Sequence, residues 1–190
     1  EVTRLFYRGF ALSNYQKLRQ HDIFSILFPL TQCQSKPSHE LFCQQAFYNA
    51  DQRYRAGKSL SPVFLFAIVL WHPFKSRMRV GFRDKQFQSA FDACFKEVCQ
   101  AQKNQVAMSQ RVFLGVREIF HMQYQLEQWR NLKTAFLAKH QRFRAAMDFF
   151  ILRAMMKEVD EFLAIAWCDY RKSHEGKMSS RPKRFAHKTV

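Results

Sequence analysis

The sequence predicts an all-α protein, a compact multi-helix domain with a flexible basic C-terminal tail. Turn signals are rare, because only 5 Gly and 5 Pro occur in 190 residues. The intervals between them are rich in helix formers such as Leu, Ala, Gln, Lys, Arg and Met. The 21 Phe residues and the hydrophobic content of 47% supply large side chains that helix faces can bury.

In the N-terminal part, the apolar spacing predicts two short helices within residues 2–29, closed by Pro29. A loop is expected over residues 31–38. Helical spacing returns over residues 39–55, and Gly57 follows as a stop signal for that helix.

The next segment has the strongest helix signal. Ser61 and Pro62 combine a capping hydroxyl with a proline at the first helical position, where its missing N–H costs nothing. The run VFLFAIVLW that follows is apolar on all sides, which predicts a helix buried all round. We expect His72-Pro73 to end this helix and the basic stretch 75–85 to form a loop or a frayed helix end.

Helical patterns continue over residues 87–100 and 108–131, and two or more helices are predicted within residues 135–167. The last segment, residues 171–190, contains seven Lys or Arg residues and one acidic residue. Few large apolar side chains are available there for burial, which favours disorder. We therefore divide the chain into a body of residues 1–170 and a basic tail.

The charge of the chain points to a polyanionic partner. Lys and Arg total 31 against 15 Asp and Glu, a formal net charge of +16. RNA, DNA and an anionic membrane all satisfy that sign. A membrane is disfavoured, because the tail shows no amphipathic face with Leu or Trp, and the longest apolar run is half of the roughly 20 residues that a span needs.

Cysteine usage favours a cytoplasmic protein. The 5 cysteines are odd in number and show no zinc-finger spacing. We interpret them as buried or incidental thiols in a reducing cytoplasm. Glu1 is not an initiator methionine, and a hydrophobic pattern begins at once, which suggests a piece of a longer protein.

We predict no catalytic residues and no metal site. The one acid-x-acid element, Glu158-Val159-Asp160, falls in a helical pattern, where residues two apart point about 200° from one another. We interpret it as a solvated helix face. The sequence also lacks the motifs GxxxxGK[ST], GxGxxG and HExxH.

Basic residues interleaved with aromatic residues are the remaining functional signal. Arg142 and Arg153 lie eleven positions apart, close to three helical turns, so they can share a phosphate-tracking face. Alternatively, Arg117 and Arg144 pair with Glu118 or Asp148 and hold helices together. The candidate RNA-binding residues are Arg53, Arg111, Arg117, Arg142, Arg144, Arg153, Arg181, Lys183 and Arg184.

Three stretches carry a family resemblance. NADQR at residues 49–53, followed by SPVFLFA and Trp71, resembles an N-x-D-x-R motif followed by a P-A-F-L-F-A helix that ends in W-x-P. REIF and Gln123, within residues 117–123, match R-[DE]-I-W-x-x-Q. RFRAAMDFF with LRA, within residues 142–154, is similar to R-F-R-A-A-Y-D-x-x-x-L-R-A.

Together these stretches resemble the C-terminal half of bacterial poly(A) polymerases, members of the class II nucleotidyltransferase superfamily. The resemblance covers about residues 1–170. The bodies of CCA-adding enzymes, in the same superfamily, lack the RFRAAMD combination. Two departures are Phe120 and Met147, which stand where the family has Trp and Tyr.

The resemblance implies an RNA-binding region of an enzyme that adds poly(A) with ATP and Mg²⁺. The expected partner is a single-stranded RNA 3′ end, with RNA-decay proteins as further candidates. Because the catalytic head and the neck would precede Glu1, we expect this chain to be inactive alone and to hold no cofactor. The alternative is a stand-alone helical module, a relic of the polymerase, that binds nucleic acid or docks a partner.

Overall fold

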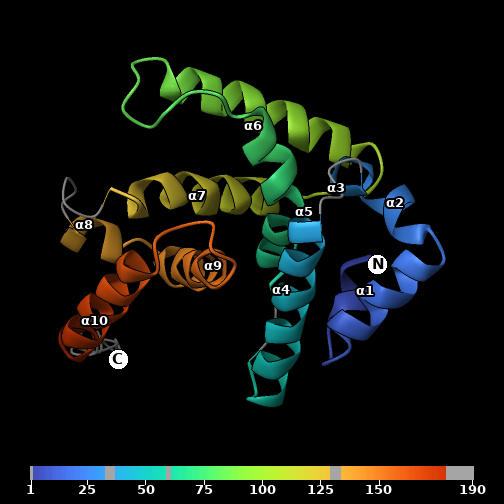
Figure 1. The fold of residues 1–190 in the computed structure, drawn as a ribbon, viewed down its shortest axis with the longest axis horizontal. Coiled ribbons are helices and arrows are strands. Elements are labelled where there is room, and N and C mark those ends of the chain that lie inside the picture. The colour runs from blue at the N-terminus through green and yellow to red at the C-terminus, as the bar shows by residue number, and fades with distance from the viewer. Residues whose placement is uncertain (1, 33–36, 59–60, 129–133, 179–190) are drawn as a thin grey trace, which may run out of the picture.

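The computed structural model describes residues 2–32, 37–58, 61–128 and 134–178, which form helices and no strands. This confirms the predicted all-α class. Figure 1 shows α5 near the centre, with α1 to α3 on one side and α8 to α10 on the other. The elements are a 3₁₀ helix, η1 (Val2–Phe6), and the α-helices α1 (Ala11–Gln20), α2 (Ile23–Leu27), α3 (Pro29–Gln32), α4 (Pro37–Arg55), α5 (Pro62–Arg77), α6 (Phe87–Lys103), α7 (Gln110–Leu126), α8 (Thr134–Ala138), α9 (Phe143–Met155) and α10 (Glu161–Met178).

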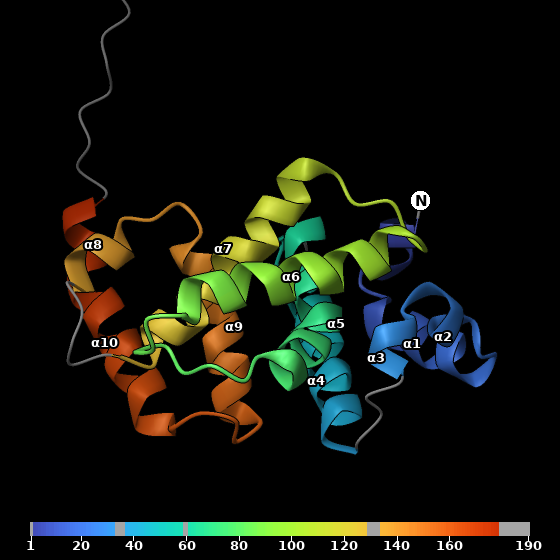
Figure 2. The ribbon, with the colours of Figure 1, turned by 90° about the horizontal axis from the view of Figure 1, so that it is seen from above.

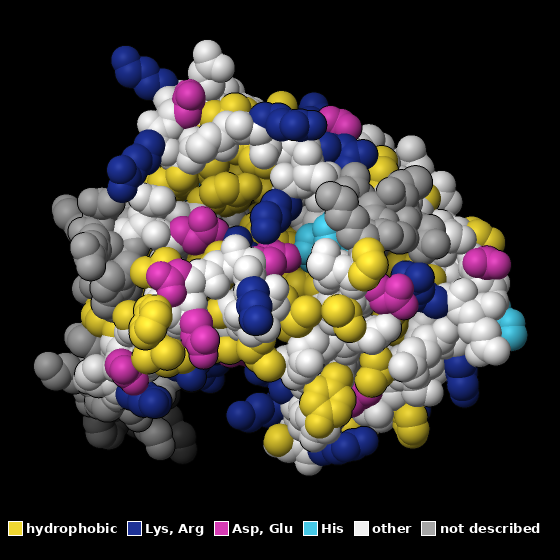
Figure 3. All heavy atoms as spheres, in the orientation of Figure 1, with side chains coloured by type: hydrophobic (Ala, Val, Ile, Leu, Met, Phe, Trp, Pro, Cys, Tyr) yellow, Lys and Arg dark blue, Asp and Glu magenta, His cyan; other side chains and the backbone are white. Residues whose placement is uncertain are grey.

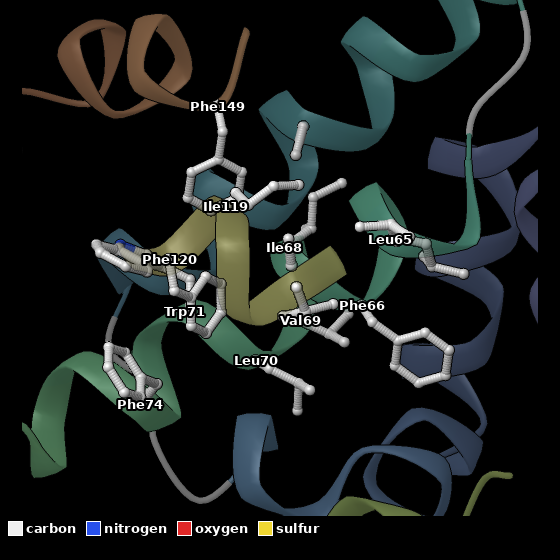
Figure 4. Close-up of a cluster of buried hydrophobic side chains, with 14 of the residues drawn as sticks. Leu65, Phe66, Ile68, Val69, Leu70, Trp71, Phe74, Ile119, Phe120 and Phe149 are labelled. Atoms are coloured by element: carbon white, nitrogen blue, oxygen red, sulfur yellow. The ribbon is translucent and has the colours of Figure 1, made fainter. Parts of the chain in front are cut away.

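Helix α5 is buried all round from Leu65 to Phe74, as its uninterrupted apolar run predicts. Its start is also as expected, since the Ser61 hydroxyl accepts the Phe64 N–H at 3.2 Å and Pro62 occupies the first turn. Figure 4 shows Trp71 of α5 beside Phe120 of α7 and Phe149 of α9. The Trp71 ring meets both rings edge to face, with centroids 5.1 and 5.6 Å apart. Three helices therefore share one aromatic core.

The predicted end of this helix at His72-Pro73 is wrong, because α5 continues through Pro73 to Arg77. A proline inside a helix has no N–H for the carbonyl four residues earlier, which here belongs to Val69. The hydroxyl of Thr31, from α3, donates to that carbonyl at 2.6 Å and replaces the missing donor. A distant segment thus satisfies the backbone group that would otherwise be left unpaired.

The N-terminal helices also differ in detail from the expectation. Pro29 begins α3 where the sequence suggested that it closes a helix. Gly9, with φ +81°, makes the turn before α1, and Gly57, with φ +71°, follows α4 as the predicted stop signal. The carboxylate of Asp51 then caps α1 from the neighbouring helix, accepting the N–H groups of Ala11 at 2.7 Å and Leu12 at 3.1 Å.

A second hydrophobic cluster joins the C-terminal end of α7 to α8, α9 and α10. Trp167 of α10 is fully buried there, and its indole N–H donates to the Leu126 carbonyl at 2.9 Å. Helix α10 continues past the predicted body boundary at residue 170 as far as Met178. Figure 2 shows α8, α9 and α10 together at one end of the molecule.

The cysteines that the structure describes are free thiols. Cys43, Cys94 and Cys99 are buried and Cys168 is half-buried, in line with the expectation of buried or incidental thiols. Burial raises the pKa of the Cys43 thiol to about 12. Cys33 lies outside the described residues.

Candidate nucleic-acid interface

Residues of the motif at 49–53 make contacts on two opposite sides of α4. Asp51 is buried and caps α1, as described above. Arg53, two positions later and therefore on the opposite side of the helix, reaches Asp148 of α9 at 2.7 Å. The acidic member of the motif thus fixes α1 on α4, whereas the arginine faces α9.

The carboxylate of Asp148, on α9, is approached by arginines from two other helices. Besides Arg53 of α4, the carboxylate has Arg171 of α10 at 3.9 Å. Arg144 lies one turn before Asp148 on α9 and is exposed. The side chains of Arg53 and Asp148 are 41% and 28% exposed, so both remain accessible to a ligand.

A fourth arginine lies at the start of α9. Arg142 is the N-cap residue of this helix, and its Nε donates to Glu118 of α7 at 3.3 Å. Its guanidinium passes close to Gly115, where an added Cβ would come within 3.4 Å of Nη2. We name the set Arg53, Arg142, Arg144 and Arg171 the basic junction.

The basic junction gathers positive charge from three helices around two partly exposed carboxylates, those of Glu118 and Asp148. Figure 3 shows Lys and Arg side chains along the lower edge of the molecule, in the indentation between α10 and the C-terminal end of α4. Ion pairs at such exposure contribute little to stability. The arginines can therefore exchange a carboxylate for a phosphate at small cost to the fold.

The partner of Arg117 is not the one that the sequence suggested. Arg117 contacts Asp92 of α6 at 2.6 Å, not its neighbour Glu118. Glu118 pairs with Arg142. Adjacent residues on a helix do not face each other, so Arg117 and Glu118 each form an ion pair with a residue outside α7.

Arg153 does not belong to the same surface as Arg142. Its side chain is 3% exposed, and its guanidinium lies over the Trp71 ring at 4.4 Å. It donates to Glu127 at 2.7 Å and to Gln123 at 3.3 Å. The expected shared phosphate-tracking face of Arg142 and Arg153 is therefore wrong. The eleven-residue spacing brings Arg142 and Arg153 roughly into line along α9. However, α7 and the connection between α9 and α10 cover Arg153.

The acid-x-acid element is also placed differently from the expectation. Glu158 and Asp160 lie in the connection between α9 and α10, not on a helix, and Glu158 is not solvated. Its carboxylate forms a hydrogen bond with Nε2 of His72 at 2.5 Å. It also accepts hydrogen bonds from the Trp71 indole N–H and from Nζ of Lys75, both at 3.0 Å. Burial alone would raise the pKa of Glu158. The hydrogen bonds from His72 and Trp71 and the charge of Lys75 more than offset burial and lower that pKa well below its usual range.

These contacts decide whether the pair fits a metal. Both oxygens of Glu158 are already engaged by cationic or N–H donors, which a divalent cation would have to displace. Within the described ranges, no three His, Cys, Asp or Glu side chains are grouped so that they could hold a metal ion. The Glu158 and Asp160 pair therefore does not fit Mg²⁺.

The remaining candidates divide into two groups. Arg111 is exposed near the start of α7. Arg181, Lys183 and Arg184 lie outside the described residues. Sequence reasoning missed Arg171, which it assigned to the tail. The apolar run of α10, with Trp167 four residues earlier, was the signal that could have extended the ordered helix to include it.

Comparisons with known proteins identify a family and several relatives. Residues 83–188 match the family described as the polymerase A arginine-rich C-terminus. A relative named poly(A) polymerase I from Salmonella typhi is 26% identical over 181 residues, which cover 91% of this chain and 39% of that protein. Relatives with the same name from Escherichia coli O157:H7 and Haemophilus influenzae are each 24% identical, over 91% and 92% of this chain.

The chain therefore spans about two fifths of the length of these relatives, with 39% and 40% of them covered. No helix in the described part of the chain is both long enough and apolar enough to cross a membrane. The family match includes α6 to α10, from which three of the four arginines of the basic junction come. This chain belongs to the family of the arginine-rich C-terminus of polymerase A.

Proposed function

We propose that this chain is the RNA-holding region of a bacterial polyadenylating enzyme. It binds the single-stranded 3′ end of an RNA in the cytoplasm while adenylate transfer takes place on another part of the parent protein. The observation that carries the proposal is the basic junction, in which Arg53 of α4 and Arg171 of α10 approach the partly exposed carboxylate of Asp148 on α9. The matched family and the names of the relatives support the same conclusion.

The arrangement of these arginines suits the phosphate backbone of a nucleic acid better than a single small anion. Arg53 and Arg171 approach Asp148 from different helices, and Arg142 lies at the start of the helix between them. Consecutive phosphates of a single strand can contact such a series in turn. Each contact releases condensed counterions, so the affinity depends on salt and little on base sequence.

ATP and Mg²⁺ belong to the proposed reaction of the parent protein. We assign the nucleotide and its metal to the catalytic region of that protein, and the engaged oxygens of Glu158 support this assignment. RNA-decay proteins as additional partners stay a prediction. Co-sedimentation of this chain with a purified bacterial exoribonuclease would check it.

Salt-dependent RNA binding tests the proposal. Fluorescent oligo(A) is titrated with the wild-type chain and with Arg53→Ala and Arg144→Ala at several salt concentrations. We expect each substitution to reduce the slope of log affinity against log salt by roughly 0.7, the value for one phosphate contact on a single strand. Helicity should be retained, because the Arg53 and Arg144 side chains bury little apolar surface in the fold.

Lys96→Ala is the matched control for a general effect of charge. Lys96 is exposed on α6, which Figure 1 shows on the opposite side of α5 from the C-terminal end of α4. Its removal should leave the slope unchanged. Unchanged slopes for both arginine variants would exclude the basic junction from the RNA path.

A second experiment separates binding from catalysis. In a primer-extension assay with oligo(A), ATP and MgCl₂, the purified chain should bind the primer and incorporate no AMP, because the part of it that the structure describes groups no three His, Cys, Asp or Glu side chains that could hold a metal. Extension that persists after gel filtration would contradict the assignment of catalysis to another region.

A further inference from the structure

Two aromatic residues near the C-terminal turn of α4 are left outside the core. Phe10 is 61% exposed and Tyr54 is 48% exposed. Other aromatic residues of the same segments, such as Phe6 and Phe47, are almost completely buried. Exposed aromatic rings next to arginines are the elements from which single-strand binding surfaces are built.

Local contacts hold the Tyr54 ring in place. Gly9 makes its turn against this ring, and an added Cβ at Gly9 would lie 3.0 Å from Cδ1 of Tyr54. The ring therefore packs against backbone on one side, while nearly half of the residue stays open to solvent. A ring that is already fixed loses little conformational freedom when a ligand stacks on it.

The backbone position of Phe10 is fixed by the Asp51 cap at the start of α1. Phe10 immediately precedes Ala11, whose N–H is bound by Asp51 of α4. Asp51 lies one helical turn before Tyr54. The cap thus places an exposed aromatic residue from the start of α1 close to the C-terminal turn of α4.

Basic residues flank these rings in the sequence. Arg8 precedes the turn at Gly9, and Arg55 and Lys58 follow Tyr54; all three are exposed. Asp51 is the acidic residue nearest in sequence, and it is buried and occupied as a cap. Figure 3 shows hydrophobic side chains next to Lys and Arg side chains over the C-terminal end of α4.

We infer that the exposed ring of Tyr54 is a stacking site for a base of single-stranded RNA. The inference rests on the proposed function and adds to it a contact with the base, whereas the basic junction contacts phosphates. Tyr54 follows Arg53 directly, about 100° around the axis of α4, so a strand whose phosphate meets Arg53 can lay a neighbouring base on the ring. Every base offers a π-face, so the site selects single strands and not a sequence.

Titrations with oligo(A) that carries 2-aminopurine test the inference, because stacking quenches the fluorescence of this base. Tyr54→Ala should raise the Kd roughly ten-fold and reduce the quenching, since one base–aromatic stack is lost. The salt slope should stay at the wild-type value, because no phosphate contact changes. Tyr54→Phe should bind as the wild type does.

Two further variants make the result specific. Tyr54→Leu keeps an apolar side chain against Gly9 without an aromatic face and should behave as Tyr54→Ala does, even if the alanine variant folds poorly. Tyr48→Ala is the control, because Tyr48 is also 48% exposed on α4 but lies about 120° away around the helix. This control should leave the Kd unchanged.

The outcomes distinguish the inference from the proposed function. If Tyr54→Leu binds like the wild type while Arg53→Ala lowers the salt slope, stacking is overturned and the phosphate-binding face stands. If duplex RNA loses as much affinity as oligo(A) in Tyr54→Ala, the contact is not with an unstacked base and the inference is wrong. If the wild-type chain binds no RNA, the proposed function fails first.

Discussion

Glu158 has the environment of a structural ion-pair centre. Its side chain is 13% exposed, and α5 supplies His72 and Lys75 to its carboxylate. Arg153 of α9 reaches the same carboxylate at 3.4 Å. Neutralising it would leave the buried His72 and Arg153 side chains without a charged acceptor, which is costly even though the intact pair need not be very stabilising.

We expect Glu158→Gln to lower the free energy of unfolding by roughly 3 kcal/mol near neutral pH. The folded pKa of Glu158 is lowered, so its contribution is complete above the unfolded pKa, near 4.3, and is lost as pH falls toward the folded pKa. The difference between wild type and variant should therefore shrink by roughly 1 kcal/mol between pH 6 and pH 3.5, measured by urea unfolding.

Glu97→Gln provides the comparison for that measurement. Glu97 also pairs with an arginine, Arg77 at 3.1 Å, but it is 67% exposed. Its substitution should change stability by less than about 1 kcal/mol at either pH. A Glu158 effect that is equally small would show that the buried network does not hold the connection after α9 to α5.

Individual side-chain roles were the least predictable from the sequence. The helical spacing of Arg142 and Arg153 correctly indicates that both lie on one helix, but it contains no information on what packs against each. Likewise, Arg144 and Asp148 are one turn apart, yet Arg53 and Arg171 also approach that carboxylate from other helices. Long-range ion pairs depend on how helices cross, which local patterns do not encode.

Among the elements, the contact between α5 and α7 depends on a glycine. Gly115 is buried, and an added Cβ would lie 2.9 Å from both methyl carbons of Val63. No turn or positive φ requires a glycine at this position, because it lies within α7. The absence of a side chain instead allows the two helices to approach closely.

Gly115→Ala should therefore destabilise the chain by about 1–3 kcal/mol, although alanine is the better helix former, because the core must give way around the new methyl group. Thermal unfolding followed by circular dichroism would measure the loss. Combining it with Val63→Ala should recover part of it, a coupling of at least about 0.5 kcal/mol.

Gly81→Ala controls for a general effect of replacing glycine. Nothing lies within 4 Å of an added Cβ at Gly81, so that variant should be neutral or slightly stabilised. Equal losses at both positions would show that the close approach of α5 and α7 is not responsible.

The helices were largely predictable because their signals are local. Nine consecutive apolar residues after the Ser61 cap indicate the buried start of α5. Its continuation past Pro73 could not be predicted, since the donor that replaces the missing N–H is the Thr31 hydroxyl, 38 positions from Val69. Sequence patterns give the start of this helix, whereas tertiary contacts decide its end.

At the scale of the whole molecule, folding and RNA binding should be separable along the chain. The described helices contain the core, and among the described residues Trp167 of α10 is its last fully buried large side chain. Beyond Met178, the sequence contributes Arg181, Lys183, Arg184 and Lys188 and no acidic residue. The division proposed from the sequence stays a prediction, with the helical boundary now at Met178 instead of residue 170.

Truncation after Met178 tests this division. The thermal transition should keep its midpoint, because the Trp167 contact with Leu126 and the second hydrophobic cluster remain intact. Oligo(A) binding should persist through the basic junction. The salt slope should fall by roughly 2–3, the sum expected if all four removed charges contact phosphate. A truncated chain that unfolds without a cooperative transition would place the missing residues in the fold. An unchanged slope would leave the arginines around Asp148 as the main phosphate contacts.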